Sequence, residues 1–337
     1  MRAVVSLFAL LVNLAIFALA PAAAEPLHIR ISWVAIVSNL PSILFIKPGI
    51  AQHDGKSYVF EPTHYASTPL MIPALATNDL DIATLAYSSL GAAINKAGLT
   101  DIRVIADELQ DGVGSYYSDE FMVRKDTPYR TIADMKGKIL ASSGIGGAMD
   151  MALRVMLKKM GLDAKDFTIV EVTMPNHRAA LADGKVDLIS SPLPFSQDAE
   201  LRKIARPLFT QHDAIGTTQM IIWAARAGFL AKNRAAIVDF LEDSIRARRY
   251  FADPANHEEV VRLVSAMTKQ PPSQYDAWLF TKNDYYRDPN GVPDLDALQR
   301  NIDVQRDLGF LEGKIDVAEY ADLGLIKEAA SRVAAAK

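Results

Sequence analysis

The chain has 337 residues, of which 50% are hydrophobic, and this suits two compact domains of ordinary size better than one. Its formal net charge is −4 at pH 7, from 36 lysines and arginines against 40 aspartates and glutamates mixed along the chain. This balance argues against nucleic-acid binding, which needs clustered positive charge. The absence of cysteine excludes a disulfide framework and cysteine metal ligands.

Residues 1–24 have the pattern of a secretory signal peptide. Arg2 supplies positive charge, an apolar stretch follows from Val4 to Ala20, and an A-x-A site precedes Glu25. The apolar run is shorter than the roughly 20 residues that span a bilayer, so we expect cleavage after residue 24 instead of a membrane anchor. Because no cysteine can carry a lipid, the sequence predicts a periplasmic protein that is not a lipoprotein.

The mature chain opens with a β-α-β-α-β series. Alternating apolar and polar residues predict a strand over Leu27–Trp33. A helix is expected from about Asn39 to Gly55, and a strand at Tyr58–Phe60. A second helix from Thr68 to about Thr77 and a third strand from Asp81 complete the series.

A second series repeats this order. It consists of a strand at Lys138–Ala141, a helix from about Gly147 to Met160, a strand at Thr168–Val172, a helix near Arg178–Ala182 and a strand at Val186–Ile189. The clearest repeat pairs "ALATNDLDIATLAYSS", from residue 74, with "ALADGKVDLISSPLPFS", from residue 180. The pattern predicts two α/β lobes, each with a largely parallel sheet.

The remaining segments indicate how the lobes are joined. Phe121–Val123 and Gln219–Trp223 flank the second series and are predicted to be the chain crossings between lobes. Lobe 1 would then comprise residues 25–118 and 218–337, and lobe 2 residues 119–217. Helices are expected over Arg234–Phe251 and His257–Met267, followed by the turn-rich "DPNGVPD" from Asp288.

Four loops are expected to share one ligand cleft, because ligands of such sheets bind beyond the carboxyl ends of the strands. These loops are residues 34–39, 86–89, 142–147 and 190–195. Their hydroxyl, amide and aromatic candidates, with two tyrosines near the expected hinge, are Trp33, Ser38, Asn39, Tyr87, Ser88, Ser89, Tyr116, Tyr117, Ser142, Ser143 and Phe195. No lysine or arginine is among them, so we expect a neutral or singly charged organic ligand, with a flat or apolar part stacked on aromatic rings.

The loop in "KILASSGIGGAM" joins a predicted strand to a helix. Gly144, Gly146 and Gly147 would let the backbone approach a ligand, and the helix start offers free N–H groups to an anion or carbonyl. A serine N-cap with glycines that serve only the turn explains the same residues. A dinucleotide motif is not complete, because Met149 stands where its last glycine or alanine is required.

The sequence shows no catalytic constellation. No serine sits in a G-x-S-x-G turn, and no two of the six histidines have the spacing of a zinc pair on one helix. We therefore predict no catalytic residue, no metal and no cofactor.

Two segments carry a resemblance to a known family. "TIADMKGKILASSGIGGAMDMALRVMLKKMGL", from Thr131, resembles the second-lobe signature of the periplasmic solute-binding proteins of ABC importers in the nitrate/sulfonate/taurine class, with Met135 in place of the usual leucine. That domain is shared with thiamine-pyrimidine synthases. "ALATNDLDIATLAYSSLGAA" resembles the first-lobe segment, and the likeness extends from residue 27 to about 270.

The resemblance implies a two-lobed, type II-like periplasmic binding protein fold with a two-strand hinge. Such a protein would be a monomer that closes over one small-molecule ligand and delivers it to an ABC permease and its ATPase in the inner membrane. The loops "WVAIVSNLPS" and "SSPLPF" depart from the sulfonate and nitrate binders, so the resemblance does not identify the ligand.

Two other functions remain open. A pyrimidine-synthase-like enzyme on the same fold would use histidine and a cysteine-rich segment, which the lack of cysteine and the secretion signal oppose. A periplasmic sensor that presents its ligand-bound form to a membrane receptor has the same sequence features as a transport component.

Overall fold

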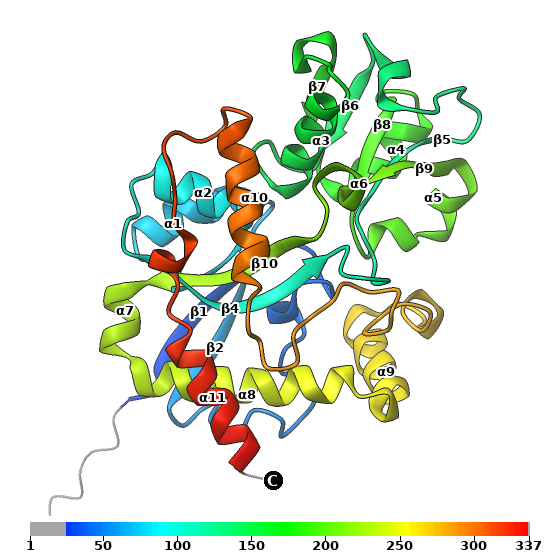
Figure 1. Ribbon diagram of the computed structural model, residues 1–337. Helices are drawn as coiled ribbons and strands as arrows, with labels where there is room; N and C mark the ends of the chain where they lie inside the picture. Colours follow the sequence, from blue (N-terminus) through cyan, green and yellow to red (C-terminus); the bar gives the residue numbers. More distant parts are fainter. Residues whose placement is uncertain (1–24, 336–337) are drawn as a thin grey trace, which may run out of the picture.

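The computed structural model describes residues 25–335. The predicted signal peptide therefore lies outside the described residues. Within them the chain forms two α/β lobes, each built on a five-stranded sheet (Figure 1). No helix within residues 25–335 combines the length and the apolar character that a bilayer span requires.

The first sheet has the strand order β2-β1-β3-β10-β4. Its strands are β1 (Leu27–Trp33), β2 (Tyr58–His64), β3 (Ile82–Ala86), β4 (Ile102–Asp111) and β10 (Thr218–Arg226). Strands β1, β2 and β3 pair in parallel, and β10 runs antiparallel to both β3 and β4. Strand β3 is buried along its whole length, as expected for a central strand with covered faces.

The second sheet repeats this topology in the order β7-β6-β8-β5-β9. Its strands are β5 (Glu120–Arg124), β6 (Ile139–Ser142), β7 (Thr168–Glu171), β8 (Leu188–Ser191) and β9 (Ala205–Thr210). Again three strands are parallel, and the fourth in order, β5, is antiparallel to its neighbours. Each sheet was predicted to be largely parallel and is a mixed sheet with one antiparallel strand.

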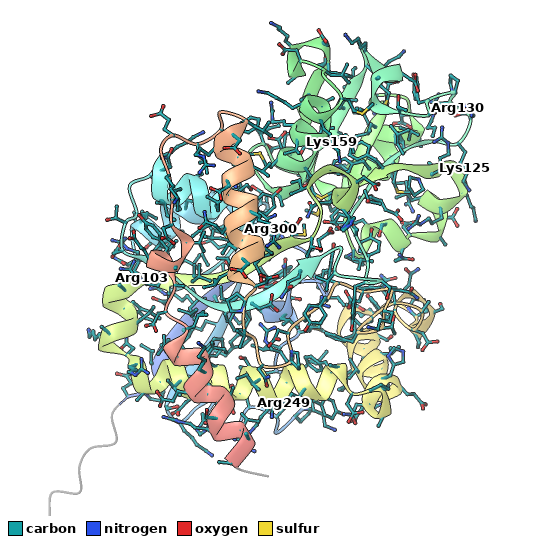
Figure 2. The ribbon with its side chains drawn as sticks, in the orientation of Figure 1. Arg103, Lys125, Arg130, Lys159, Arg249 and Arg300 are labelled. Atoms are coloured by element: carbon teal, nitrogen blue, oxygen red, sulfur yellow. The ribbon has the colours of Figure 1, made fainter. Side chains whose placement is uncertain are left out.

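Helices cover both sheets. Those of the two series are α1 (Met71–Ala76), α2 (Tyr87–Asn95), α3 (Ala148–Lys159), α4 (His177–Ala182), α5 (Ala199–Ile204) and α6 (Gln211–Ile215). The later helices are α7 (Ala227–Lys232), α8 (Arg234–Ala252), α9 (His257–Thr268), α10 (Leu295–Asp307) and α11 (Gly324–Ala335). Figure 1 shows α8 and α11 crossing each other beside the first sheet, far from the second. The labelled basic side chains in Figure 2 are spread over several elements of both lobes and form no single cluster.

The repeat seen in the sequence has a structural cause. Asp81 and Asp187, which precede β3 and β8, each accept a backbone N–H from the neighbouring first strand of their series, from Arg30 and Ile139 respectively, at 3.0 Å. The turns before them contain Asn78 and Gly184, both with positive φ. An aspartate at the equivalent position therefore links the equivalent pair of strands in each lobe.

The predicted strands and most predicted helices are confirmed, but one helix is wrong. Between Asn39 and Gly55 the chain forms only a 3₁₀ turn over Leu40–Ser42 and further turns. Ser42 diverts the backbone, because its hydroxyl accepts the N–H of Val37 and donates to the carbonyl of Asn39. Pro48 and a positive φ at Gly49 then prevent a helix from continuing.

The predicted chain crossings are displaced. Phe121–Val123 lies within β5 and Gln219–Trp223 within β10, so both are sheet strands. The chain instead passes from the first sheet to the second between Asp111 and Glu120, and returns between Thr210 and Thr218. The two passages touch, since the Gln211 N–H donates to the Asp119 carbonyl at 2.7 Å.

Candidate ligand-binding site

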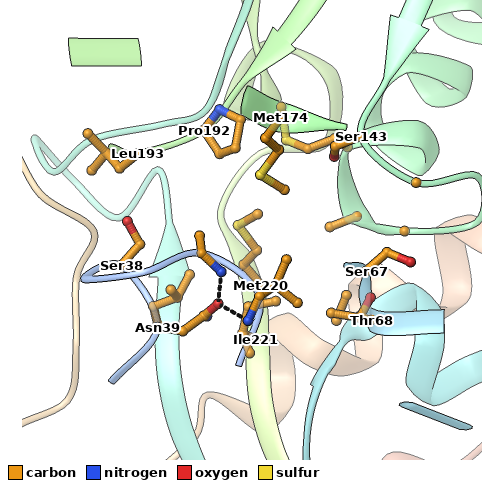
Figure 3. A pocket seen from close by; sticks show the side chains of 18 of the residues that line it. Ser38, Asn39, Ser67, Thr68, Ser143, Met174, Pro192, Leu193, Met220 and Ile221 are labelled. Atoms are coloured by element: carbon orange, nitrogen blue, oxygen red, sulfur yellow. Dashed lines mark hydrogen bonds between the residues drawn. The ribbon is translucent and has the colours of Figure 1, made fainter. Parts of the chain in front are cut away.

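A cavity of about 70 Å³ lies between the two sheets (Figure 3). Strands β1, β3, β6 and β8 each end at or immediately before a lining residue, as the rule for carboxyl ends of parallel strands predicts. The first lobe contributes Val34, Ala35, Ser38, Asn39, Ser67, Thr68, Ala86, Leu109, Met220, Ile221 and Tyr285. The second contributes Ser143, Gly144, Gly147, Ala148, Met149, Met174, Pro192 and Leu193. All four predicted loops therefore reach the cavity, and no lining residue is charged.

Asn39 shapes the first loop. Its side-chain oxygen accepts the N–H groups of Val34 and Ala35 at 2.9 and 2.8 Å, and its amide nitrogen donates to Glu108 at 2.5 Å. Within this loop Val37 has φ of 72°, in the left-handed region that a β-branched side chain avoids. Such strain persists only where its surroundings hold it, so the loop is preorganised by Asn39 and Ser42.

The glycine-rich loop lets the two lobes approach closely. A Cβ atom on Gly144 would lie 2.8 Å from the Cβ of Ser67 across the cavity, and Gly146 has φ of 81°. The start of α3 is already complemented by the protein, because Asp150 accepts the Gly146 N–H at 2.9 Å. Asp150 also pairs with Arg154 at 2.9 Å.

Five of the predicted site residues line the cavity: Ser38, Asn39, Ser143, Gly144 and Gly147. The nine others are not among the lining residues. Ser142 is buried just before Ser143 on the preceding strand, and Gly146 faces Pro69 of the first lobe. Phe195 begins a 3₁₀ turn two residues beyond the lining residue Leu193.

The predicted aromatic residues pack against protein groups. Trp33 lies against His64, with ring centroids 4.5 Å apart, and Tyr116 lies against Tyr286 at 5.2 Å. Tyr117 packs edge-on against a tyrosine and donates to the Ser191 carbonyl at 3.2 Å. Tyr285 is the one aromatic residue among those that line the cavity, so the expected aromatic stacking platform is replaced by aliphatic and methionine side chains.

The first turn of α2 lies behind the cavity wall. The buried Tyr87 hydroxyl donates to the Ala148 carbonyl of the second lobe at 3.3 Å. Ser89 shares a hydrogen bond of 2.7 Å with Thr68, whereas the Ser88 hydroxyl has no partner among the described residues. Tyr87 therefore links the two lobes, and Ser89 holds the lining residue Thr68.

Several cavity-lining residues come from distant segments of the chain and were not predicted from the sequence. Tyr285 comes from the connection after α9, and its hydroxyl accepts the Leu193 N–H at 3.0 Å and donates to Asp119 at 2.5 Å. Met174, Met220 and Ser67 also carried no local signal, since a methionine or serine beside a strand is ordinary. Only the pairing of the sheets brings them together.

Two buried acids, Glu108 and Asp119, contact lining residues, and a third, Asp111, contacts Asp119. Burial raises the pKa of Glu108 to about 7, against the lowering effect of the hydrogen bonds from Trp223 and Asn39. Burial likewise raises the pKa of Asp111 to about 7. The pKa of Asp119 is raised well above its ordinary value by burial and by the nearby charge of Asp111.

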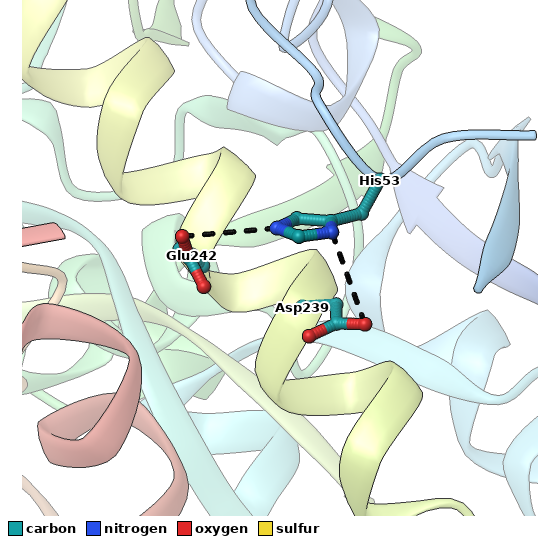
Figure 4. A group of neighbouring side chains, drawn as sticks. All are labelled: His53, Asp239 and Glu242. Carbon is teal, nitrogen blue, oxygen red and sulfur yellow. Dashed lines mark ion pairs between the residues drawn. The ribbon is translucent and has the colours of Figure 1, made fainter. Parts of the chain in front are cut away.

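One side-chain group within residues 25–335 has the composition and spacing of a metal site: His53, Asp239 and Glu242 (Figure 4). The His53 ring lies 3.9 Å from Asp239 and 3.7 Å from Glu242. Arg246 pairs with Glu242, and Arg332 pairs with Asp239 at 3.0 Å. Because two guanidinium groups already neutralise these carboxylates, we assign no metal there.

A family model described as the NMT1-like family matches residues 22–265. The chain belongs to the NMT1-like family. The match includes both sheets and the four cavity loops, but Tyr285 lies beyond it. No curated protein matches this chain.

Solved structures share the fold of this NMT1-like protein. The alkanesulfonate-binding protein SsuA from Xanthomonas axonopodis pv. citri, bound to MOPS, has a TM-score of 0.70 at 18% identity, over 89% of this chain and 100% of that one. The periplasmic nitrate-binding protein NrtA from Synechocystis PCC 6803 has a TM-score of 0.71 at 17% identity, over 92% and 89%. The desulfurization enzyme DSZB has 0.64 at 14% identity, over 91% and 99%. These likenesses establish a two-lobed periplasmic binding protein fold, which binding proteins and an enzyme have in common.

Proposed function

We propose that this protein is the substrate-binding component of an ABC import system, which captures a small organic solute between its lobes in the periplasm and delivers it to a membrane permease. The observation that carries the proposal is the cavity itself, whose wall comes from both lobes and from all four strand-end loops. Membership of the NMT1-like family and the likeness to sulfonate- and nitrate-binding proteins support it.

Hinge closure is the mechanism that fits this arrangement. We take residues 25–118 and 218–337 as lobe 1 and residues 119–217 as lobe 2, with the hinge at the two adjacent chain passages. Contacts across the cavity, such as Tyr87 to Ala148, form only when the lobes are close together. A ligand that touches both walls would stabilise the closed state because it binds that state better than the open one.

Binding without chemistry is favoured over an enzyme on the same fold. No histidine, cysteine, lysine, arginine or carboxylate is among the cavity-lining residues, so the wall offers no general base or charged nucleophile. The DSZB likeness extends to the fold alone. Recovery of a bound solute unchanged after long incubation, checked by mass spectrometry, would support the binding function; its conversion would contradict it.

Small-angle X-ray scattering tests the closure. We expect the radius of gyration of the purified protein to fall when a solute that raises its melting temperature is added. Identical scattering at saturation would contradict closure. Permease and ATPase genes beside the coding gene would favour import, whereas a sensor-kinase gene would favour a sensor.

A further inference from the structure

We propose that the cavity selects a compact, uncharged ligand with an apolar middle and a hydrogen-bonding group at each end, and that it rejects anions. This inference rests on the proposed function, since it takes the cavity as the solute site. It separates this protein in ligand class from the sulfonate- and nitrate-binding proteins that share its fold.

The free hydrogen-bonding groups stand at two ends of the cavity. The Ser38 hydroxyl is buried and has no hydrogen-bond partner within the described chain. Ser67, which is half-buried, and Ser143 also line the cavity. Figure 3 shows Ser38 at one end, with Ser67 and Ser143 at the other. A buried hydroxyl without a partner is costly, so a ligand that bonds to Ser38 gains affinity, and Ser67 and Ser143 offer hydroxyl groups to its other end.

The other polar side chains of the wall already form hydrogen bonds with protein groups. Asn39 makes three hydrogen bonds with protein groups, and Thr68 bonds to Ser89. Tyr285 both donates and accepts within the protein. Among the side chains of the wall, a ligand therefore meets single hydroxyl groups and no array of donors that could replace the hydration of an ion.

The middle of the cavity is apolar. Met174 and Met220 point toward it from opposite lobes in Figure 3, and Leu109 and Ile221 extend the same wall. Thioether and aliphatic groups favour an uncharged body, and methionine adapts to its shape. The volume of about 70 Å³ favours a ligand of a few non-hydrogen atoms.

Glu108 behind the wall opposes an anion in its ionised form, whereas the raised pKa of Asp119 favours its neutral form. Glu108 touches the lining residue Asn39, and Asp119 touches the lining residue Tyr285. Two cations also lie nearby. Arg287 donates to the carbonyl of the lining residue Ser38 and lies 2.9 Å from the buried Asp284. Arg248 lies 3.7 Å from Asp107. Each of these guanidinium groups therefore faces a carboxylate, and neither arginine is among the cavity-lining residues.

The raised pKa of Glu108 is further evidence against an anionic ligand. The environment that raises the pKa of Glu108 to about 7 disfavours negative charge, and it would disfavour an added anion for the same reason. The start of α3, which could attract an anion, is complemented by Asp150. The start of α2 beside Ala86 has no capping side chain, so its backbone N–H groups can bind the acceptor oxygen of a carbonyl or sulfone, and the matched pairs of test compounds decide whether they also hold an anion.

Matched pairs of small molecules test this selectivity on the purified protein. The pairs are acetate and acetamide, propionate and propionamide, methanesulfonate and dimethyl sulfone, and nitrate and nitromethane. We expect at least one neutral member to bind at least tenfold more tightly than its anion in thermal-shift and calorimetric titrations. Tighter binding of the anions would overturn the inference but keep the proposed function. Binding of neither member in any pair would count against both.

A pH series tests whether the buried acids cause the selectivity. Methanesulfonate stays ionised between pH 5.5 and 8.0, whereas Glu108, flanked by Arg248 and Arg287, gains its proton across that interval. We expect the affinity ratio of methanesulfonate to dimethyl sulfone to rise several-fold from pH 8.0 to pH 5.5. A constant ratio would overturn the role of the acids. Glu108→Gln should raise the same ratio at pH 8.0, and Asp134→Asn, at a surface capping box, should leave it unchanged.

Discussion

The Tyr285 hydroxyl donates a hydrogen bond of 2.5 Å to the Asp119 carboxylate, and this bond ties the wall of the cavity to a chain passage between the lobes. Tyr285 lines the cavity, and Asp119 precedes the first strand that follows the passage. Because Tyr285 also accepts the Leu193 N–H from the second lobe, one buried side chain touches the cavity wall, the chain passage and the opposite lobe. A substitution that moves the cavity wall, the chain passage or the loop at Leu193 should therefore shift the other two as well.

The hydroxyl groups at the cavity ends should contribute directly to ligand affinity. We expect Ser38→Ala and Ser143→Ala each to weaken the binding of a neutral ligand by roughly 1–1.5 kcal/mol, because each removes one hydrogen bond. Calorimetric titration measures the change. Ser142→Ala is the matched control, since its hydroxyl is buried but Ser142 is not a lining residue. An equal loss in the control would show that the cavity wall is assigned incorrectly.

Asp111 should make the protein less stable as the pH rises. Its pKa is raised from 3.8 to about 7, so the folded state holds the proton more tightly than the unfolded state does. The free energy of unfolding should therefore fall as the pH increases from about 4 to about 7. Asp111→Asn should reduce this slope and stabilise the protein at pH 8 by on the order of 1–3 kcal/mol. The asparagine can still accept the Asp119 N–H and donate to the Ser118 hydroxyl.

Urea unfolding at several pH values checks this sign. Asp134 supplies the opposite control, because hydrogen bonds from the backbone N–H groups of Arg130 and Thr131 lower its pKa. Asp134→Asn should lose stability at neutral pH and lose little at a pH below the folded pKa of Asp134. A wild-type protein whose stability rises steadily from pH 5 to pH 8 would contradict the assignment at Asp111.

Gly112 is expected to be essential for the contact between the two chain passages. It has φ of 66°, and a Cβ atom there would lie 2.6 Å from Nδ1 of His212. Gly112→Ala combines backbone strain with this clash and should cost about 2–4 kcal/mol of stability. Gly98→Ala has a similar φ of 68° but meets no atom within 4 Å, so it should cost only about 1 kcal/mol. Chemical unfolding compares the two variants, and equal losses would show that the packing of the passages is not tight.

Tyr87 should favour the closed arrangement of the lobes. Tyr87→Phe removes its hydrogen bond to the Ala148 carbonyl, which is formed across the lobes, and should reduce ligand affinity by roughly 0.5–1.5 kcal/mol. Its effect on unfolding should be small in comparison with a core truncation. Tyr275→Phe is the matched control, because its hydroxyl bonds to Thr268 within lobe 1. Affinity that falls in the control but not in Tyr87→Phe would refute the role of this contact.

Local patterns in the sequence were sufficient to predict the strands and the repeat. The periods of β1, β6 and α3 follow from residues that are neighbours along the chain, and Asp81 and Asp187 mark the same strand junction in both halves. The failed helix after Asn39 shows the limit. Its apolar spacing suited a helix, but the hydrogen bonds of Ser42 to Val37 and Asn39 outcompeted it.

The four strand-end loops could be assigned from sequence, because parallel strands bring their carboxyl ends to one edge. Which side chains face the cavity depends on how the two sheets pack, so Tyr87 and Tyr117, plausible ligand contacts by type, became contacts between lobes. Tyr285 and Met220 join the wall from distant segments, and no local pattern records a contact over more than one hundred residues. The uncharged character of the cleft was readable from its residue types. The raised pKa of Glu108 was decided only by tertiary structure, since it arises from burial.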